Sequence, residues 1–270
     1  MRHVEAYSRL AGVYDDIVVD PCHAHWASFL DELWRADPEG VRSVLDLCCG
    51  TGLLAGELIA RGYRVVGVDA SDAMLALARE RLGPEVTLSR MTLPDLTVEG
   101  VFDAAVCTFD GLNYLNAAEL RLTFAAVGER MRPGGWLVFD LHTDAMLDFT
   151  VANPTVAGRS AGNDFVISSV VDPGARTCDT RIELTRPRHG EPFSEQHRQY
   201  FHADADVRAA LGDAGFAVLA VEEEYTHEPA DGSTLRATWT ARRREEWCRR
   251  EAVAQDVARR PPGELVSGWL

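Results

Sequence analysis

Lysine is missing from this 270-residue chain, because all 27 positions counted as lysine or arginine are arginine. Schiff-base chemistry, which needs a lysine amine, is therefore excluded, and so is phosphate binding by the lysine of a Walker loop. Long apolar runs are missing too. No segment approaches the roughly 20 apolar residues that span a bilayer, and residues 1–16 contain no signal-peptide core. We expect a soluble cytoplasmic protein with no membrane partner.

Positive charge is scarce as well, since 42 acidic residues outnumber the 27 arginines and the formal net charge is −15. A chain of this charge is repelled by phosphate backbones, so we expect no nucleic-acid partner. The six cysteines are scattered, in neither a disulfide framework nor a metal-binding spacing. Five histidines are not grouped with cysteines or carboxylates in any ligand spacing: His3, His23, His25, His189 and His227. We therefore expect free thiols and no metal site.

Apolar strands alternate with helical patterns through residues 41–150. Strands are expected at 43–47, 63–68, 86–89, 102–107 and 136–141, and helices at 53–61, 71–82 and 117–131. Ser71 and Asn116 are expected to be helix N-caps, the latter with Glu119 as its capping-box partner. A later hairpin of residues 216–225 and 235–241 adds two strands. The alternation predicts an α/β protein whose doubly wound, mostly parallel, Rossmann-like sheet has seven strands.

Other segments flank or interrupt this core. Residues 1–40 are predicted to form an N-terminal helical lid, with apolar faces along 6–19 and 23–34. Residues 151–203 predict an antiparallel insertion on the substrate side, with strands at 165–171, 180–185 and 195–202. Residues 204–243 complete the core with a helix and the hairpin. Residues 244–270 are expected to form a charged helix and a tail, whose expected role is docking or homodimer formation.

The segment Asp46-Leu47-Cys48-Cys49-Gly50-Thr51-Gly52 lies between the first parallel strand and its helix. Its glycines let the backbone approach a ligand closely, and the helix N-terminus offers unpaired N–H groups and a positive dipole end. Such a turn suits a negatively charged or carboxylate-bearing ligand. Asp69 ends the second strand, where its side chain can accept hydrogen bonds from ribose hydroxyls. This order of elements indicates a site for a nucleoside cofactor.

The same segment resembles the D-x-G-x-G-x-G motif of class I S-adenosylmethionine-dependent methyltransferases, with Cys48 in place of the first glycine. The resemblance covers residues 1–150 and 204–243, and its further motifs are Tyr14-Asp15, Val68-Asp69-Ala70-Ser71, Phe102-Asp103-Ala104 and Arg132-Pro133-Gly134-Gly135. It implies S-adenosylmethionine as the cofactor and a small-molecule methyl acceptor, methylated by in-line displacement. The chain is similar to glycine-type and amino-sugar N-methyltransferases, which favours nitrogen over oxygen as the methylated atom.

The resemblance also implies roles for individual residues. Asp46 is expected near the methionine amino group and Asp69 on the ribose, while Tyr7 and Tyr14 are expected to close over the methionine end. The cofactor-binding residues expected in full are Tyr14, Asp46, Cys48, Gly50, Thr51, Gly52, Asp69, Ala70, Met74, Met91, Thr92, Thr108 and Phe109.

Substrate and catalytic candidates follow the later strands, because ligands of an open parallel sheet bind beyond the carboxyl ends of its strands. His142 is the first candidate for a catalytic base, since the ordinary pKa of histidine suits proton transfer near neutral pH. Its alternative role is that of a hydrogen-bonded loop histidine. Tyr14 and Tyr114 are further catalytic candidates. Substrate contacts are expected from Tyr7, Asp110, Asn113, Tyr114, His142, His197 and Tyr200, the alternatives being loop stabilisation, turn capping or an exposed sheet position.

Two other functions remain open on the sequence. The spacing Gly50-x-Gly52-x-x-Ala55 also matches a dinucleotide fingerprint, which would make the chain an NAD-linked oxidoreductase. Asp69 does not decide between the two cofactors, because both place an acid on a ribose. Asp46 before the glycines and the late hairpin favour S-adenosylmethionine. The second alternative is a protein that keeps the methyltransferase fold without methylating, as a cyclase or a scaffold.

Overall fold

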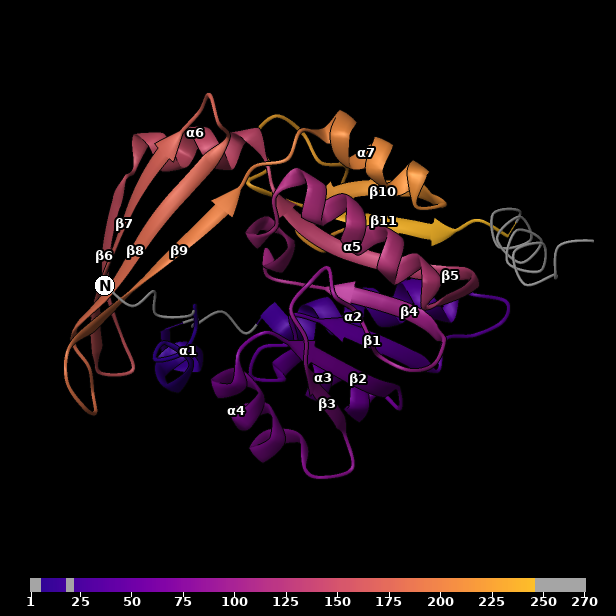
Figure 1. Cartoon of the computed structure of the whole chain (residues 1–270), viewed down its shortest axis with the longest axis horizontal. Helices are drawn as coiled ribbons and strands as arrows, with labels where there is room; N and C mark the ends of the chain where they lie inside the picture. The colour runs from indigo at the N-terminus through magenta and orange to yellow at the C-terminus, as the bar shows by residue number, and fades with distance from the viewer. Residues whose placement is uncertain (1–5, 18–21, 246–270) are drawn as a thin grey trace, which may run out of the picture.

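The structure, a computed structural model, describes residues 6–17 and 22–245 of the chain (Figure 1). Its helices are α1 (Ala11–Ile17), α2 (Cys22–Arg35), α3 (Leu53–Ala60), α4 (Asp72–Leu82), the 3₁₀ helix η1 (Gly111–Tyr114), α5 (Ala117–Glu129), α6 (Asp144–Ala152) and α7 (Asp204–Asp213). Its strands are β1 (Ser43–Leu47), β2 (Arg64–Asp69), β3 (Thr87–Arg90), β4 (Phe102–Cys107), β5 (Met131–His142), β6 (Thr155–Ser160), β7 (Asn163–Asp172), β8 (Thr177–Arg186), β9 (Phe193–Tyr200), β10 (Phe216–Glu223) and β11 (Arg236–Arg243).

The main sheet has seven strands in the order β10-β11-β5-β4-β1-β2-β3. The strands β5, β4, β1, β2 and β3 pair in parallel, whereas β11 runs antiparallel to both β5 and β10. The prediction of a doubly wound, mostly parallel sheet of seven strands is therefore confirmed. The central strand β1 is buried along its whole length, as expected for a parallel strand that is covered on both faces.

Alternate residues of β1 belong to two different hydrophobic cores. Val44 lies in the cluster that contains Trp26 of α2 and Leu54 of α3. Leu45 lies in the cluster that contains Phe124 of α5. Because neighbouring side chains of a strand point to opposite faces, α2 and α3 cover one face of the sheet and α5 covers the other (Figure 1).

Two helices that start at the carboxyl edge of the main sheet have the caps that their sequences predict. The Ser71 hydroxyl accepts a hydrogen bond from the Met74 backbone N–H at the start of α4. Asn116 and Glu119 form a complete capping box at the start of α5. These caps satisfy N–H groups that have no partner inside the helix. Both helices therefore begin at defined points beside the edge where the parallel strands end.

The insertion forms a separate antiparallel sheet in the order β6-β7-β8-β9. The prediction of three strands is wrong in number, because β6 adds a fourth, and α6 precedes the sheet where no helix was expected. The strand β6 carries mostly exposed residues and so lacks the apolar alternation that marks a half-buried strand. The strand β9 lies next to η1 of the main domain and α1 lies between this sheet and α4 (Figure 1).

The N-terminal segment is less helical than the sequence predicts. Of the helix predicted at 6–19, the structure has only α1, and Tyr7 before it adopts a left-handed conformation with φ 62°. Residues 18–19 lie outside the described part, as does the predicted C-terminal helix and tail except for residues 244 and 245. In the described ranges, none of the helices is long and apolar enough to cross a membrane.

Candidate active site

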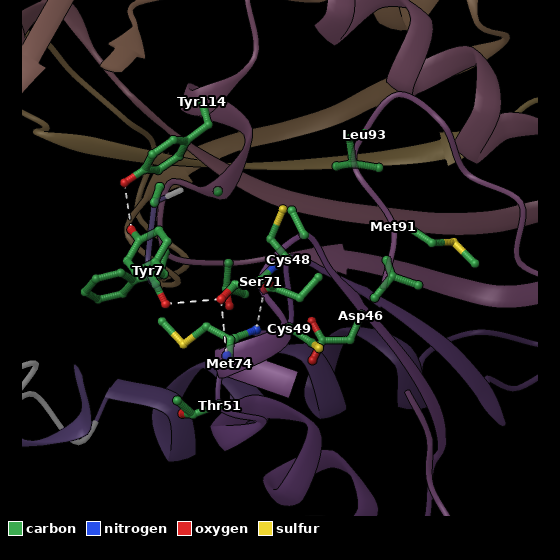
Figure 2. Close-up of a pocket in the computed structure, with 18 of the residues that line it drawn as sticks. Tyr7, Asp46, Cys48, Cys49, Thr51, Ser71, Met74, Met91, Leu93 and Tyr114 are labelled. Carbon is green, nitrogen blue, oxygen red and sulfur yellow. Dashed lines mark hydrogen bonds between the residues drawn. The ribbon is translucent and has the colours of Figure 1, made fainter. Parts of the chain in front are cut away.

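A cavity of about 310 Å³ lies where β1, β2 and β4 end (Figure 2). The predicted site residues that line it are Tyr7, Tyr14, Asp46, Cys48, Gly50, Thr51, Asp69, Ala70, Met74, Met91, Thr92, Thr108, Phe109 and Tyr114. They come from the turns after four strands and from the N-terminal segment, which are far apart in the sequence. The tertiary structure thus brings together nearly all residues that the methyltransferase resemblance implies for the cofactor.

The turn after β1 is held open by left-handed backbone conformations. Cys48, Gly50 and Gly52 have φ values of 54°, 56° and 79°. Cys48 therefore adopts the conformation for which the family motif supplies glycine, at a cost of roughly 1–2 kcal/mol for a residue with a side chain. The Cβ of Cys48 packs against Gly111. A Cβ on residue 111 would lie only 2.9 Å from it, so the missing side chain of Gly111 leaves room for Cys48. The cysteine is accommodated because the loop after β4 has a glycine opposite.

Gly52 is the predicted cofactor residue that does not line the cavity. A Cβ on Gly52 would lie 2.9 Å from Cδ1 of Leu82 and 3.3 Å from the Cβ of Ala78. This glycine therefore allows α3 and α4 to approach each other. Its left-handed conformation still shapes the turn, so it contributes to the cavity indirectly.

Asp46 presents a buried carboxylate to the cavity. It is 2% exposed, and its Oδ2 atom has no hydrogen-bond partner among the described residues. Burial, and then the nearby charge of Asp69, raise the pKa of Asp46 from 3.8 to about 8. An unpaired buried oxygen is costly, and a cationic donor that enters the cavity would satisfy it. This carboxylate therefore fits the ammonium group of a bound amino acid.

Asp69 links the turn after β1 to the start of α4. Its two oxygens accept hydrogen bonds from the backbone N–H of Gly50 at 2.9 Å and of Ser71 at 2.8 Å. Burial raises the pKa of Asp69, while these backbone bonds lower it. Each carboxylate oxygen has a second lone pair, so Asp69 can accept further bonds from hydroxyl groups in the cavity. Asp46 and Asp69 together fit the amino-acid and ribose parts of S-adenosylmethionine.

Three tyrosines close one end of the cavity. The hydroxyls of Tyr7 and Tyr114 are 2.7 Å apart and point toward each other (Figure 2). The rings of Tyr7 and Tyr14 meet edge to face at 5.7 Å, and Tyr14 also contacts Phe109. Burial raises the pKa of Tyr7, Tyr14 and Tyr114 well above 10. All three therefore remain neutral phenols, able to donate and accept hydrogen bonds.

Glu195, which the sequence did not single out, ties the N-terminal segment to the second sheet. Its buried carboxylate accepts hydrogen bonds from the backbone N–H groups of Tyr7, Arg9 and Leu10 at 2.8, 2.5 and 2.9 Å. The face of β9 that carries Glu195 and His197 therefore packs against the N-terminal segment. The alternating sequence of β9 hardly indicates this role, because a glutamate is an ordinary residue on the exposed face of a strand.

The structure does not bring His142 to this cavity. His142 lines a second cavity of about 470 Å³ beside α6, and its backbone N–H donates to the Asn113 side chain. The role of His142 as a catalytic base stays a prediction, but His142 lies outside the cavity that the cofactor candidates line. The reason is that η1 follows β4 and lies against the end of β5, so Tyr114 of η1 lines the first cavity instead.

Four further substrate candidates, Asp110, Asn113, His197 and Tyr200, also lie outside the lining of the first cavity, whereas Tyr7 and Tyr114 line it. Asn113 is fully buried and its amide donates to the Tyr200 carbonyl, so it stabilises the loop, the alternative that the sequence left open. Asp110 accepts a hydrogen bond from Gln199. His197 is buried rather than exposed, and its ring contacts Tyr7 and Tyr114. His197 therefore does not line the cavity itself but contacts two tyrosines that do.

Further residues line the cavity without having been predicted: Ala6, His23, Cys49, Leu53, Leu54, Val68, Ser71, Leu93, Gly111, Leu115 and Glu119. Most are apolar or belong to helix starts, so their sequence pattern indicates core packing or capping. The described residues contain no cluster of three histidine, cysteine or carboxylate side chains that could hold a metal ion, and the five cysteines among them are free.

Comparisons with known proteins agree with this geometry. Residues 44–135 match the model of a methyltransferase domain family. The chain is 33% identical to the glycine N-methyltransferase of Mus musculus over 64% of its own length and 70% of that protein. It is 29% identical to the dTDP-3-amino-3,4,6-trideoxy-alpha-D-glucopyranose N,N-dimethyltransferase of Streptomyces venezuelae, over 74% of this chain and 86% of the relative.

A solved S-adenosylmethionine-dependent methyltransferase from Clostridium acetobutylicum has the same fold, with a TM-score of 0.78 and 22% identity over 88% of this chain and 99% of the other. These findings decide against an NAD-linked oxidoreductase. Three observations indicate the same family: the motif after β1, the carboxylates of Asp46 and Asp69 in the cavity, and the relatives. The chain belongs to the class I S-adenosylmethionine-dependent methyltransferases, and S-adenosylmethionine is its cofactor.

Proposed function

We propose that this enzyme methylates a nitrogen atom of a small-molecule amine. The observation that carries the proposal is the set of ionisable groups in the cavity lining, in which Asp46, Asp69 and Glu119 are acidic and no arginine takes part among the described residues. Acidic side chains without a basic partner favour a cationic amine group at the reacting end of an acceptor. The relatives named for N-methylation, which act on glycine and on an amino sugar, support the same acceptor atom.

The cofactor-binding residues are proposed as follows. Asp46 binds the ammonium group through its unpaired oxygen, and the backbone of the turn at Gly50 lies against the methionine part. Asp69 accepts hydrogen bonds from the ribose hydroxyls. The adenine lies between the apolar side chains that line the cavity beside Asp69, which are Ala70, Met74, Met91 and Leu93. When bound, S-adenosylmethionine supplies a methyl group activated by a sulfonium centre.

The acceptor is proposed to bind at the end of the cavity that the tyrosines close. Tyr7 and Tyr114 offer hydroxyls there that can orient an amine, and Tyr14 with Phe109 excludes water. An in-line displacement needs its three reacting atoms aligned, and alignment alone contributes roughly 7–11 kcal/mol in well-oriented reactions. The chain's main task is therefore to position the amine and deliver it in the neutral form that has a free lone pair.

The test compares amines with hydroxyl compounds of similar shape. Glycine and a dTDP-3-amino-3,6-dideoxyhexose are incubated with the full chain and S-adenosylmethionine, next to glycolate and dTDP-6-deoxyglucose. We expect S-adenosylhomocysteine to form with at least one amine and with neither hydroxyl compound. Formation with a hydroxyl compound alone would show O-methylation. Tight cofactor binding without product from any of the four would favour the non-methylating alternative, a cyclase or a scaffold.

A further inference from the structure

Four side chains form a continuous contact from the cavity into the second sheet. The Tyr7 and Tyr114 hydroxyls are 2.7 Å apart, and the Tyr114 hydroxyl is 3.0 Å from Nδ1 of His197. On the far side of the ring, Nε2 of His197 faces Oε2 of Glu195 at 3.6 Å. Both tyrosines line the cavity, whereas His197 and Glu195 are buried on β9 at 4% and 1% exposure.

We propose that His197, acting through Tyr114 and Tyr7, takes up the proton that the acceptor amine must lose before methyl transfer. The proposal rests on the proposed function, since it assumes an amine that binds beside Tyr7. His197 is then a positioning residue for this proton, because it does not itself touch the cavity, and Tyr7 is the catalytic residue.

The contacts determine where the histidine proton lies. Nε2 has no hydrogen-bond partner within 3.5 Å among the described residues, and the group it faces is the carboxylate of Glu195. A proton on Nε2 is therefore attracted to this carboxylate, which leaves Nδ1 free to accept the Tyr114 hydroxyl proton. The aligned direction of donation runs from Tyr7 to Tyr114 to His197.

Burial keeps the His197 ring neutral, and Glu195 is the charged group that faces its protonated form. Burial lowers the pKa of His197, and the nearby Glu195 raises it, with burial the larger effect. The ring is thus neutral near pH 7 and can take up a proton. The groups that face it are Glu195 on its own strand, Tyr114 on η1, Tyr7 before α1 and the uncharged Thr180 opposite it on β8. Once protonated, the ring faces a carboxylate.

The proton transfer balances without any further reagent. The ammonium N–H bond breaks, its electron pair stays on nitrogen and its proton passes to the Tyr7 hydroxyl oxygen. Tyr7 gives its own hydroxyl proton to Tyr114, and Tyr114 gives its proton to Nδ1 of His197. Both tyrosines end as neutral phenols and His197 ends as an imidazolium. The positive charge of the cofactor favours this direction, because it lowers the pKa of an amine bound beside it.

The first experiment does not depend on turnover. Nitrogen-15 NMR of the histidine rings is recorded on the full chain saturated with S-adenosylhomocysteine, and the His197 signals are assigned with His197→Gln. We expect a protonated Nε2 and an unprotonated Nδ1 whose resonance moves in Tyr114→Phe. A protonated Nδ1, or an Nδ1 resonance that Tyr114→Phe leaves in place, overturns the proposal.

The second experiment follows turnover against pH with the amine that forms S-adenosylhomocysteine. We expect His197→Gln to lower kcat by about 100-fold, which is within the range for general-base catalysis, while affinity for S-adenosylhomocysteine stays within about twofold. The acid limb of the pH profile should move to higher pH. Without the His197 base, the variant can methylate only amine that is already deprotonated in solution, and this fraction increases with pH. His189→Gln, on the exposed loop before β9, is the matched control.

The two experiments separate the two proposals. A kcat of His197→Gln close to that of wild type overturns the proton route even if amines are methylated. If neither probe amine reacts, the proposed function fails, and the NMR measurement still decides whether Tyr114 donates to Nδ1 of His197. Should His197→Gln lose cofactor binding altogether, Tyr114→Phe and Tyr7→Phe provide the same comparison from the other side of the contact.

Discussion

The carboxylate of Asp140 accepts a hydrogen bond from the backbone N–H of Phe109 at 2.8 Å, and this bond joins the end of β5 to the wall of the cavity. Asp140 is fully buried and also accepts bonds from the Asp110 N–H and the Tyr225 hydroxyl. Phe109 and Asp110 have φ values of 61° and 51°, which cost roughly 1–2 kcal/mol each for residues with side chains. Asp140 thus stabilises a strained stretch that shapes the site.

Replacing Asp140 with alanine should therefore destabilise the protein by about 3–5 kcal/mol, because three donors lose a buried charged partner. Urea unfolding followed by circular dichroism measures the change. Asp213→Ala is the control, since Asp213 forms an exposed ion pair with Arg121 and should cost less than about 1 kcal/mol. Equal losses in the two variants would mean that the Asp140 bonds contribute nothing specific.

Asp46→Asn should make the protein without cofactor more stable, and more so at high pH. The pKa of Asp46 is about 8 in the folded state and 3.8 ordinarily, so the folded state holds this proton to higher pH than the unfolded chain. Stability from this group is thus present below about pH 4 and is lost as the pH rises toward about 8. Denaturation of both proteins at pH 5 and pH 9 should show a larger gain for Asp46→Asn at pH 9. A gain that does not change with pH would contradict this assignment.

The same substitution should weaken cofactor binding. An ammonium group prefers the ionised carboxylate, so wild-type affinity for S-adenosylhomocysteine should increase between pH 6 and pH 8, whereas that of Asp46→Asn should stay level. At pH 8 we expect the variant to lose about 1.5–3 kcal/mol of binding free energy, the contribution of a hydrogen bond to a charged group. Isothermal titration at the two pH values measures both effects. Parallel pH dependence in the two proteins would remove Asp46 from the ammonium site.

Asp69→Ala should weaken binding of S-adenosylhomocysteine by about 1–3 kcal/mol, because it removes the proposed acceptor for the ribose hydroxyls and two bonds that hold the turn. Titration calorimetry gives the change directly. The exposed neighbour Asp72, at the start of α4, provides the control variant Asp72→Ala. An unchanged dissociation constant for Asp69→Ala would exclude Asp69 from the ribose site.

Gly111→Ala should destabilise the protein by about 1–3 kcal/mol, as expected for overpacking, because the new Cβ would lie 2.9 Å from Cys107 Sγ and from Cys48 Cβ. Gly212→Ala in α7 is the matched control, since its Cβ would meet no atom within 4 Å, and alanine there should stabilise the helix slightly. Thermal unfolding of the two variants should move in opposite directions. A shift in the same direction would show that the space beside Cys48 does not restrict position 111.

Local patterns were sufficient for the sheet and for the two carboxylates that line the cavity at the ends of β1 and β2. The turn at residues 46–52, which begins with Asp46, lies close in sequence to Asp69 at the end of β2. Asp69 lines the cavity, and so does every residue of the turn except Leu47 and Gly52. The caps at Ser71 and Asn116 were also predictable, because a cap bonds to N–H groups within three residues of itself. Such features depend on short stretches of chain, so composition and spacing reveal them.

The end of the cavity that the tyrosines line could not be worked out in this way. The sequence placed His142 beside the methyl group because it ends β5, but η1 packs against β5, and Tyr114 of η1 lines the first cavity while His142 lines the second. It left His197 as one polar residue of an exposed strand, and it did not single out Glu195. Both are buried only because β9 packs against η1 and the N-terminal segment.

The sequence by itself therefore determined the class of fold, the cofactor and the carboxylates at the ends of β1 and β2, since periodicity and close spacing encode them. The tertiary structure alone decided which side chains meet at the end of the cavity that the tyrosines line. The hydroxyl of Tyr7 reaches Tyr114, 107 residues away, and Tyr114 reaches His197, 83 residues further along. Contacts over such separations arise from the packing of whole elements, and no local pattern records them.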